Sequence, residues 1–282
     1  MKFGFFGINM NVCSNPDAAV RVAQAAEASG FESVWTGEHV VLPDPQAPPS
    51  PLPPLYPLLD PAVALAFIAA QTKKVRLGTG IIILPQRNPL VLAKELASVD
   101  VVSGGRFIFG LGIGYLKAEF DALGAPFDQK GLRSMDYLQA MKAVWTQEKP
   151  VYQGQFVDFH DIQARPQPIQ KPHPPVVIGG HTQEAFRRAV QYGNGWYGFA
   201  LDPAATEKCL IGLKEAAQQV RRPIELGELE ISITPGPQLD LDTAKRYADL
   251  GVHRLIPFRR GKTEQDLLDF VHQTRDTLIG KL

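Results

Sequence analysis

The sequence predicts an α/β fold, a (β/α)8 TIM barrel with a small β insertion before the fifth strand. Three observations lead to this prediction. The chain has 282 residues, close to the ~250 residues of a typical barrel of this kind. Short apolar segments alternate with helix-like segments along the chain, which is typical of a parallel sheet. No flexible linker divides the sequence, so a single domain over residues 1–282 is the simplest interpretation.

Eight apolar segments are the expected barrel strands. They are almost continuously apolar, as strands buried on both faces of a parallel sheet should be. In chain order they cover residues 2–8, 33–36, 75–83, 106–110, 176–178, 195–199, 229–234 and 254–258. Because each is followed by a helical pattern, the set indicates eight βα units and a closed barrel.

Eight segments between and after these strands have the pattern of helices. Several begin with a proline or a capping residue, which favours a helix start at that point. They cover residues 16–29, 61–71, 89–102, 131–145, 182–191, 203–220, 242–250 and 264–278.

Two stretches break this alternation. Residues 43–61 are so rich in proline that they can form neither a helix nor a central strand, so we expect an ordered loop after the second strand. Residues 150–175 alternate between apolar and polar and then become proline-rich, which predicts the small β insertion before the fifth strand.

Composition narrows the classes of partner. Lysine and arginine together number 29, as do aspartate and glutamate, so no net charge attracts nucleic acid or an anionic membrane. Cys13 and Cys209 show no CxxC spacing, which is typical of a reducing compartment. The N-terminal MKFGFFGINMN has too short an apolar run for a signal peptide or a membrane span. We therefore expect a cytoplasmic protein that acts on a small molecule and binds no metal.

A barrel builds its active site where the strands end, and the fourth strand ends in the glycine-rich GLGIGY, residues 110–115. This stretch does not match the dinucleotide motif GxGxxG, because Tyr115 stands in place of the third glycine. Two interpretations of Gly112 and Gly114 remain. They let a flat or phosphorylated ligand approach the backbone, or they relieve crowding inside the barrel.

The fifth strand ends in GGHT, residues 179–182, and leads directly into a helix. Free amide N–H groups and the positive end of the helix dipole then predict a phosphate site formed by Gly179, Gly180, His181 and Thr182. Thr182 also suits the N-cap position of that helix. After the last strand, Arg259 and Arg260 either meet an anionic tail or substrate or are simply solvated.

Two further strand ends carry candidate functional residues. Glu38 and His39 follow the second strand, whereas Thr79, Gly80 and Ile81 place a glycine inside an apolar strand, which indicates a bulge, a ligand against the backbone, or a packing requirement. No lysine ends a strand, and the sequence has no HxH, HExxH or GxSxG motif. A site with one imidazole and several backbone glycines suits a cofactor that carries the chemistry itself.

Several stretches of the chain, taken together and in this order, form a recognisable pattern: ESVWTGEHVVLP, RLGTGIIILPQRNPLVLAKELASVDVVSGGRFIFGLGIGYLKAEFDALG, and RPQPIQKPHPPVVIGG followed by AVQYGNGWYG. They resemble the bacterial luciferase-like superfamily and, within it, the oxidoreductases that use the deazaflavin F420. The resemblance implies a barrel with an insertion near strand 5, usually dimeric, that holds FMN or F420 at the carboxyl ends of its strands. F420, with FMN as the alternative, is therefore the expected cofactor, and a homodimer the expected assembly.

The resemblance also implies roles by position. His39 matches the histidine beside the reactive face of the deazaflavin, and Glu38 lies where such relatives carry an acidic residue. The Gly80–Ile81 bond matches a bulge with a non-prolyl cis peptide behind the ring. At Tyr115 the chain departs from the related sugar-phosphate dehydrogenases, which carry a glutamate there, and this argues against a sugar-phosphate substrate. Positions near the cofactor chain and phosphate match Gly112, Gly114, Gly179 and Gly180.

The leading hypothesis is an F420-dependent oxidoreductase that transfers a hydride between the deazaflavin and a small organic substrate. His39 is the expected acid or base, because an imidazole titrates near neutral pH, and Glu38 is expected to orient it. Tyr115 and Trp196 are expected to line the substrate pocket, and Thr79 to contact the cofactor. Two alternatives are an FMN-dependent luciferase-like monooxygenase and a non-catalytic flavin-binding barrel.

Overall fold

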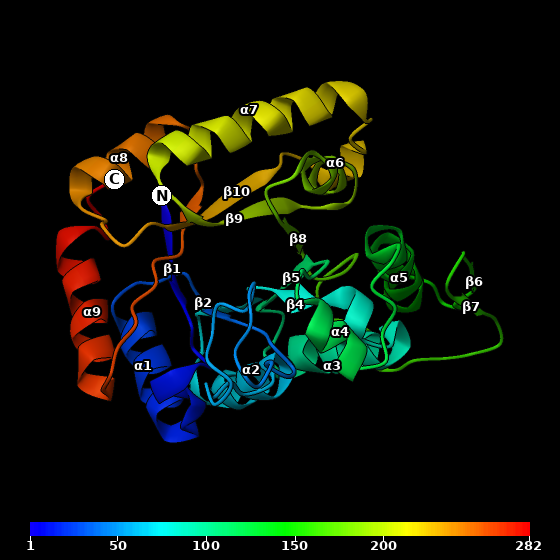
Figure 1. Ribbon diagram of the computed structural model, residues 1–282, viewed down its shortest axis with the longest axis horizontal. Coiled ribbons are helices and arrows are strands. Elements are labelled where there is room, and N and C mark those ends of the chain that lie inside the picture. The colour runs from blue at the N-terminus through cyan, green and yellow to red at the C-terminus, as the bar shows by residue number, and fades with distance from the viewer.

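The computed structural model describes residues 1–282 and shows a closed barrel of parallel strands surrounded by helices (Figure 1). The barrel order is β1, β2, β3, β5, β8, β9, β10 and β11, and β11 pairs with β1 to close it. The bounds are β1 Lys2–Phe6, β2 Ser33–Thr36, β3 Arg76–Thr79, β5 Phe107–Gly112, β8 Val176–Gly179, β9 Gly195–Leu201, β10 Glu230–Pro235 and β11 Arg254–Leu255. The predicted (β/α)8 fold is confirmed.

The eight predicted helices are present, each within one residue of its expected ends. They are α1 Pro16–Ala28, α2 Pro61–Gln71, α3 Pro89–Val102, α5 Lys130–Thr146, α6 Gln183–Tyr192, α7 Pro203–Gln219, α8 Leu241–Asp249 and α9 Glu264–Thr277. Their starts follow from local chemistry: Asn15, Asp60, Asn88 and Asp202 each accept backbone N–H bonds just before a proline-initiated helix. No helix has the length and apolar character to cross a membrane.

The structure also contains short helical elements that the sequence pattern did not predict. These are α4 Lys117–Ala122 and three 3-10 turns, Asn11–Ser14, Leu84–Gln86 and Ile224–Leu226. An element of so few residues shows too little periodicity to be recognised from the sequence. Of these elements, α4 matters most, because it supplies a side chain to the site.

The third strand differs from its prediction. Residues 75–83 were expected as one strand, but the chain forms β3 and then β4 Ile82–Ile83, with a cis peptide bond between Gly80 and Ile81. The cis bond is the one that the family resemblance implied. The break follows a close approach to β5, because the Thr79 hydroxyl bonds both the carbonyl and the N–H of Gly110, at 2.7 and 2.9 Å.

The inside of the barrel is filled with side chains, so it forms a solid floor beneath the strand ends. Trp35 is fully buried there, and Gly78 makes room for it, since a Cβ at Gly78 would lie 2.5 Å from the indole ring. This inner cluster consists of Phe6, Trp35, Ile108, Val177, Tyr197 and Ile256. A much larger cluster packs the outer face of the sheet against the helices.

The two irregular stretches are both ordered by hydrogen bonds. The end of the proline-rich segment is attached to the end of β1, where the Asn9 amide donates to the carbonyl of Leu59 at 2.6 Å. The predicted β insertion is a small antiparallel hairpin, β6 Tyr152–Gln153 and β7 Asp158–Phe159. It projects beside α5, at the side of the molecule away from both chain ends (Figure 1).

Candidate active site

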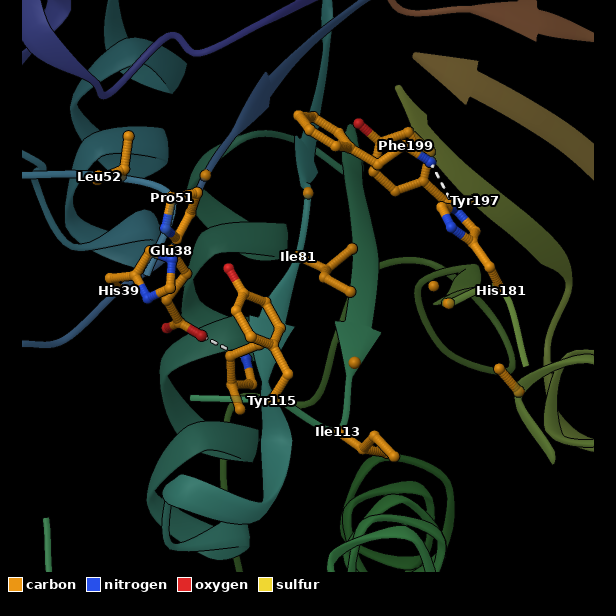
Figure 2. Close-up of a pocket in the computed structure, with 18 of the residues that line it drawn as sticks. Glu38, His39, Pro51, Leu52, Ile81, Ile113, Tyr115, His181, Tyr197 and Phe199 are labelled. Atoms are coloured by element: carbon orange, nitrogen blue, oxygen red, sulfur yellow. Dashed lines mark hydrogen bonds between the residues drawn. The ribbon is translucent and has the colours of Figure 1, made fainter. Parts of the chain in front are cut away.

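A cavity of about 680 Å³ opens at the carboxyl ends of the barrel strands. It gathers the sequence-predicted residues from β2, β3, β5 and β8, and Figure 2 shows Ile81 near its centre. All of the predicted site residues except Thr79 and Trp196 line it, and these are Glu38, His39, Gly80, Ile81, Gly112, Gly114, Tyr115, Gly179, Gly180, His181 and Thr182. The strand ends therefore meet at one place, as a parallel barrel requires.

His39 is held by a carboxylate that the sequence did not reveal. Its Nδ1 lies 3.3 Å from Oε2 of Glu119, a residue of α4. The other oxygen of Glu119 accepts the backbone N–H of Val40 at 2.6 Å. Glu119 thus positions both the imidazole and the loop that carries it. The ring of Tyr115 completes this side of the site, packing edge-on at 6.2 Å from the His39 ring.

The Glu119 carboxyl is set up to stay ionised. Its side chain is only 2% exposed. Burial by itself raises the pKa of Glu119, but the hydrogen bonds from His39 and Val40, together with the charge of a protonated His39, outweigh it and lower the pKa below its usual value. A buried carboxylate that contacts one ring nitrogen of a histidine leaves the other ring nitrogen for proton transfer, so the pair has the geometry of an acid/base dyad.

Glu38 has a different role from the one predicted for it. Its carboxylate is buried and accepts hydrogen bonds from the guanidinium of Arg87 and the backbone N–H of Ile83. Arg87 also pairs with Asp60, at 2.9 Å. Burial raises the pKa of Glu38, and Arg87 and Ile83 oppose that rise. The prediction that Glu38 orients His39 is therefore corrected: Glu119 does so, and Glu38 joins the loop after β2 to β4.

The glycines of β5 and β8 meet a packing requirement. A Cβ at Gly112 would lie 2.3 Å from Cδ1 of Ile81, and one at Gly179 would lie 2.6 Å from the same atom. At Gly110 a Cβ would lie 1.8 Å from the carbonyl oxygen of Thr79. Of the two interpretations left open for Gly112, the contact with Ile81 supports relief of crowding, and a ligand contact at Gly112, which also lines the cavity, stays a prediction. These glycines let Ile81 sit low in the barrel mouth as a flat apolar platform.

Two predicted contacts lie outside the cavity. Thr79 is fully buried and its hydroxyl donates a hydrogen bond to the carbonyl of Gly110, so its side chain does not face the cavity. Trp196 was expected to wall the substrate pocket, but it is fully buried and its Nε1 donates to the carbonyl of Gly180 at 2.8 Å. Both side chains support cavity-lining residues from behind.

One end of the cavity, which we call the α6 end, is suited to an anion. It comprises Gly180, His181, Thr182, Arg188 and Lys130. Thr182 caps α6 as predicted, accepting the N–H of Ala185 at 3.2 Å. No hydrogen bond within the protein uses the backbone N–H groups of residues 180–182, so they are free to donate at a helix N-terminus.

Two basic residues that the sequence analysis did not single out complete the α6 end. Nε of Arg188 is buried without a hydrogen-bond partner, and the Nζ of Lys130 lies 3.5 Å from the centre of the Phe127 ring. His181 accepts the N–H of Phe199 through Nε2 at 3.1 Å (Figure 2). Burial lowers the pKa of His181, so this imidazole favours its neutral form. Lys130 and Arg188 lie within helices, which is why no strand-end signal pointed to them.

The profile of the luciferase-like monooxygenase family matches residues 1–275. The chain belongs to the luciferase-like monooxygenase family. An uncharacterized protein of Mycobacterium bovis is 31% identical over 284 residues, covering 97% of each chain. The oxygenase component of a flavin-dependent trigonelline monooxygenase from Acinetobacter baylyi is 31% identical over 179 residues, which is 63% of this chain and 46% of that protein.

Solved structures with the same fold include a monooxygenase and an F420-dependent dehydrogenase. A monooxygenase from Streptomyces bottropensis superposes with a TM-score of 0.77 at 22% identity, covering 99% of both chains. An F420-dependent secondary alcohol dehydrogenase in complex with an F420–acetone adduct has a TM-score of 0.76 at 15% identity, covering 98% of both chains. At these identities the likeness establishes the fold alone.

Proposed function

We propose that the protein is an F420-dependent oxidoreductase that transfers a hydride between the deazaflavin and a small carbonyl compound or alcohol. The observation that carries this proposal is the His39–Glu119 pair at the rim of the cavity. Hydride addition to a carbonyl leaves negative charge on oxygen, so the reaction needs a proton donor within hydrogen-bond reach. An imidazole paired with a buried carboxylate suits that requirement.

The residues present fit a planar ring with a strongly anionic tail. The side chain of Ile81 offers an apolar surface for a ring, and the α6 end offers free N–H groups with Lys130 and Arg188. F420 carries a phosphodiester and carboxylates in its tail, whereas FMN ends in a single phosphate. Two basic side chains at the α6 end therefore favour F420. When bound there, the deazaflavin would supply or accept the hydride.

The chain's own residues would donate and accept the proton. Because Nδ1 of His39 faces Glu119, Nε2 is the ring nitrogen left to face the cavity. In the reductive direction the carbonyl carbon gains the hydride, the C=O π bond breaks, and the oxygen takes the proton from Nε2. Glu119 stabilises the imidazolium before that transfer and fixes the ring's orientation throughout. Oxidation of an alcohol uses the same groups in reverse.

An FMN-dependent monooxygenase is the second candidate. The trigonelline monooxygenase component, a flavin-dependent enzyme, matches this chain at 31% identity over 179 residues. The same platform and anion site would hold FMN. In that case His39 would stabilise an intermediate or deprotonate the substrate, and oxygen would be consumed.

The two cofactors can be separated directly. We expect the purified protein to bind F420 at micromolar or lower concentration, and reduced F420 to be reoxidised with an aldehyde or ketone under anaerobic conditions, measured by the return of the deazaflavin absorbance. FMN is expected to bind more weakly. Tight FMN binding without F420 binding, together with substrate-dependent oxygen uptake, would replace the proposal with the monooxygenase.

The Glu119→Gln variant tests the dyad. The side-chain carbonyl of glutamine can still accept the N–H of Val40, but its amide group would face Nδ1 of His39 and no longer present a carboxylate to the ring. We expect kcat for carbonyl reduction to fall roughly 10–100-fold, because the imidazole loses the group that orients it. Steady-state kinetics with reduced F420 measure this effect.

The matched control is Asp121→Asn on the same helix, which removes an exposed carboxylate that pairs only with Lys117. This control is expected to leave kcat unchanged. If Glu119→Gln lowers thermal stability but leaves kcat unchanged, Glu119 acts only as a structural anchor for the loop after β2.

A further inference from the structure

The rim of the cavity opposite the α6 end is organised by one asparagine. The backbone N–H of Asn11 donates to the carbonyl of Pro57 at 2.9 Å, and its side-chain amide donates to the carbonyl of Gly261 at 2.9 Å. Asn11 therefore ties the proline-rich segment to the loop after β11. Tyr56 directly precedes Pro57, and Arg260 directly precedes Gly261. Both Tyr56 and Arg260 line the cavity. We call this pair the Arg260 rim.

Arg260 is a cation without an acidic partner. None of the ion pairs in the structure includes it. Burial raises the pKa of the Tyr56 hydroxyl, and the positive charge of Arg260 counteracts that rise. Because Asn11 bonds the carbonyls of both Pro57 and Gly261, it holds the segments that carry Tyr56 and Arg260 side by side at the cavity.

This cation is separate from the cofactor's anion site. The α6 end follows β8, which is separated from β11 by β9 and β10 in the barrel order. His39, in contrast, follows β2, with only β1 between β2 and β11. In the barrel order Arg260 is therefore nearer to His39, the proposed proton donor, than to the α6 end.

The wall on this side of the cavity is apolar. It is lined by Phe6, Met10, Leu52, Leu58 and Phe258. The remaining charged groups of the cavity are already accounted for, because Glu38 is paired with Arg87, and Lys130 and Arg188 lie at the α6 end. A substrate that reaches His39 thus meets apolar side chains and a single unpaired charge.

We propose that the substrate is a carboxylic acid with an apolar body, whose carboxylate binds Arg260 and Tyr56 while its reacting carbon–oxygen group lies at His39. This inference rests on the proposed hydride-transfer function and names the substrate class of the same site. One guanidinium and one hydroxyl match the two oxygens of a carboxylate, and the apolar wall matches the carbon chain between the two ends.

Binding can test this without turnover. The probes are straight-chain carboxylates from butanoate to decanoate, each compared with the primary alcohol of the same chain length, which shares the apolar body and lacks the charge. Isothermal titration calorimetry is run on the protein alone and on the protein saturated with F420. We expect at least one chain length whose carboxylate binds about tenfold tighter than its alcohol, in both states.

Substitutions test which residue supplies the positive charge that binds the carboxylate. Arg260→Met is expected to abolish the tenfold preference for the carboxylate and leave binding of the alcohol within about twofold. Tyr56→Phe should reduce the preference several-fold. The matched controls are Arg259→Met, the adjacent arginine that does not line the cavity, and Arg188→Met at the α6 end, and both should retain the preference.

Two results overturn the proposal. The first is equal binding of carboxylate and alcohol at every chain length in the parent protein. The second is a preference that survives in Arg260→Met but is lost in Arg188→Met or on saturation with F420, which would place the carboxylate at the α6 end. Failure of F420 to bind would remove the proposed function only, because the protein alone still reports the Arg260 preference.

Discussion

Replacement of His39 by alanine is expected to lower kcat for carbonyl reduction by about 10²–10⁴-fold, the usual contribution of a positioned general acid. The reason lies in the geometry of the site, where His39 is the side chain that couples the cavity to the buried Glu119. The dissociation constant of F420 should change by no more than a few-fold, because the proposed site for its anionic tail is elsewhere, at the α6 end. Anaerobic stopped-flow with reduced F420 separates the two quantities.

The control for this variant is His160→Ala. That histidine is exposed in the β hairpin and pairs only with Asp161, so its removal should leave kcat unchanged. Retention of full activity in His39→Ala would rule out general-acid catalysis by this residue. A loss of F420 binding as large as the loss of kcat would instead show that His39 holds the cofactor.

The second large effect concerns stability. Arg254→Leu is expected to lower the free energy of unfolding by about 3–5 kcal/mol, the usual cost of removing one partner from a buried ionic cluster. The Arg254 side chain is fully buried and binds Glu32 at 2.8 Å and also Glu230, with its guanidinium 5.7 Å from the Trp35 ring. Its loss leaves two partly buried carboxylates without their main cation.

The same cluster predicts how stability depends on pH. Burial alone would raise the pKa values of Glu32 and Glu230, but Arg254 outweighs it and both values are lowered below the ordinary range. Their contribution is therefore fully present above the unfolded-state pKa of about 4.3 and is lost as pH falls through the lower folded-state values. In Arg254→Leu this acid-induced loss should be smaller, because the folded state no longer favours the ionised carboxylates.

Urea denaturation between neutral pH and acid conditions measures both effects. Lys2→Met is the matched control, since Lys2 contacts the same Glu230 from a 47% exposed position. Its removal is expected to cost less than about 1 kcal/mol, as for other exposed ion pairs. If both variants lose the same free energy of unfolding, burial of the cluster does not determine how much it contributes to stability.

Much of the fold could be predicted because its signals are local. The strands are short apolar runs, and the helices begin at pairs such as Asn15–Pro16 and Asp60–Pro61, where cap and proline are adjacent in the sequence. The convergence of His39, Gly80 and Gly180 on one cavity followed from the rule that parallel strands end on one face of a barrel. A pattern over a few residues was enough for each step.

The partners of the site residues could not be predicted in the same way. Glu38 is adjacent to His39 in the sequence, yet the carboxylate that contacts the imidazole is Glu119, eighty positions later on a helix of six residues. The glycines at 112 and 179 follow from the side chain of Ile81, which reaches them because the chain turns at the Gly80–Ile81 bond. Nothing in the local pattern reports such contacts.

The sequence by itself determined the barrel, the order of its elements, the face that carries the site and the imidazole that lines it, because apolar periodicity and helix capping act between near neighbours. The tertiary structure alone decided that Glu119 supports His39, that Glu38 pairs with Arg87, and that Arg188 and Arg260 line one cavity. Those pairings depend on which distant segments the closed barrel brings together, and hence on three-dimensional packing.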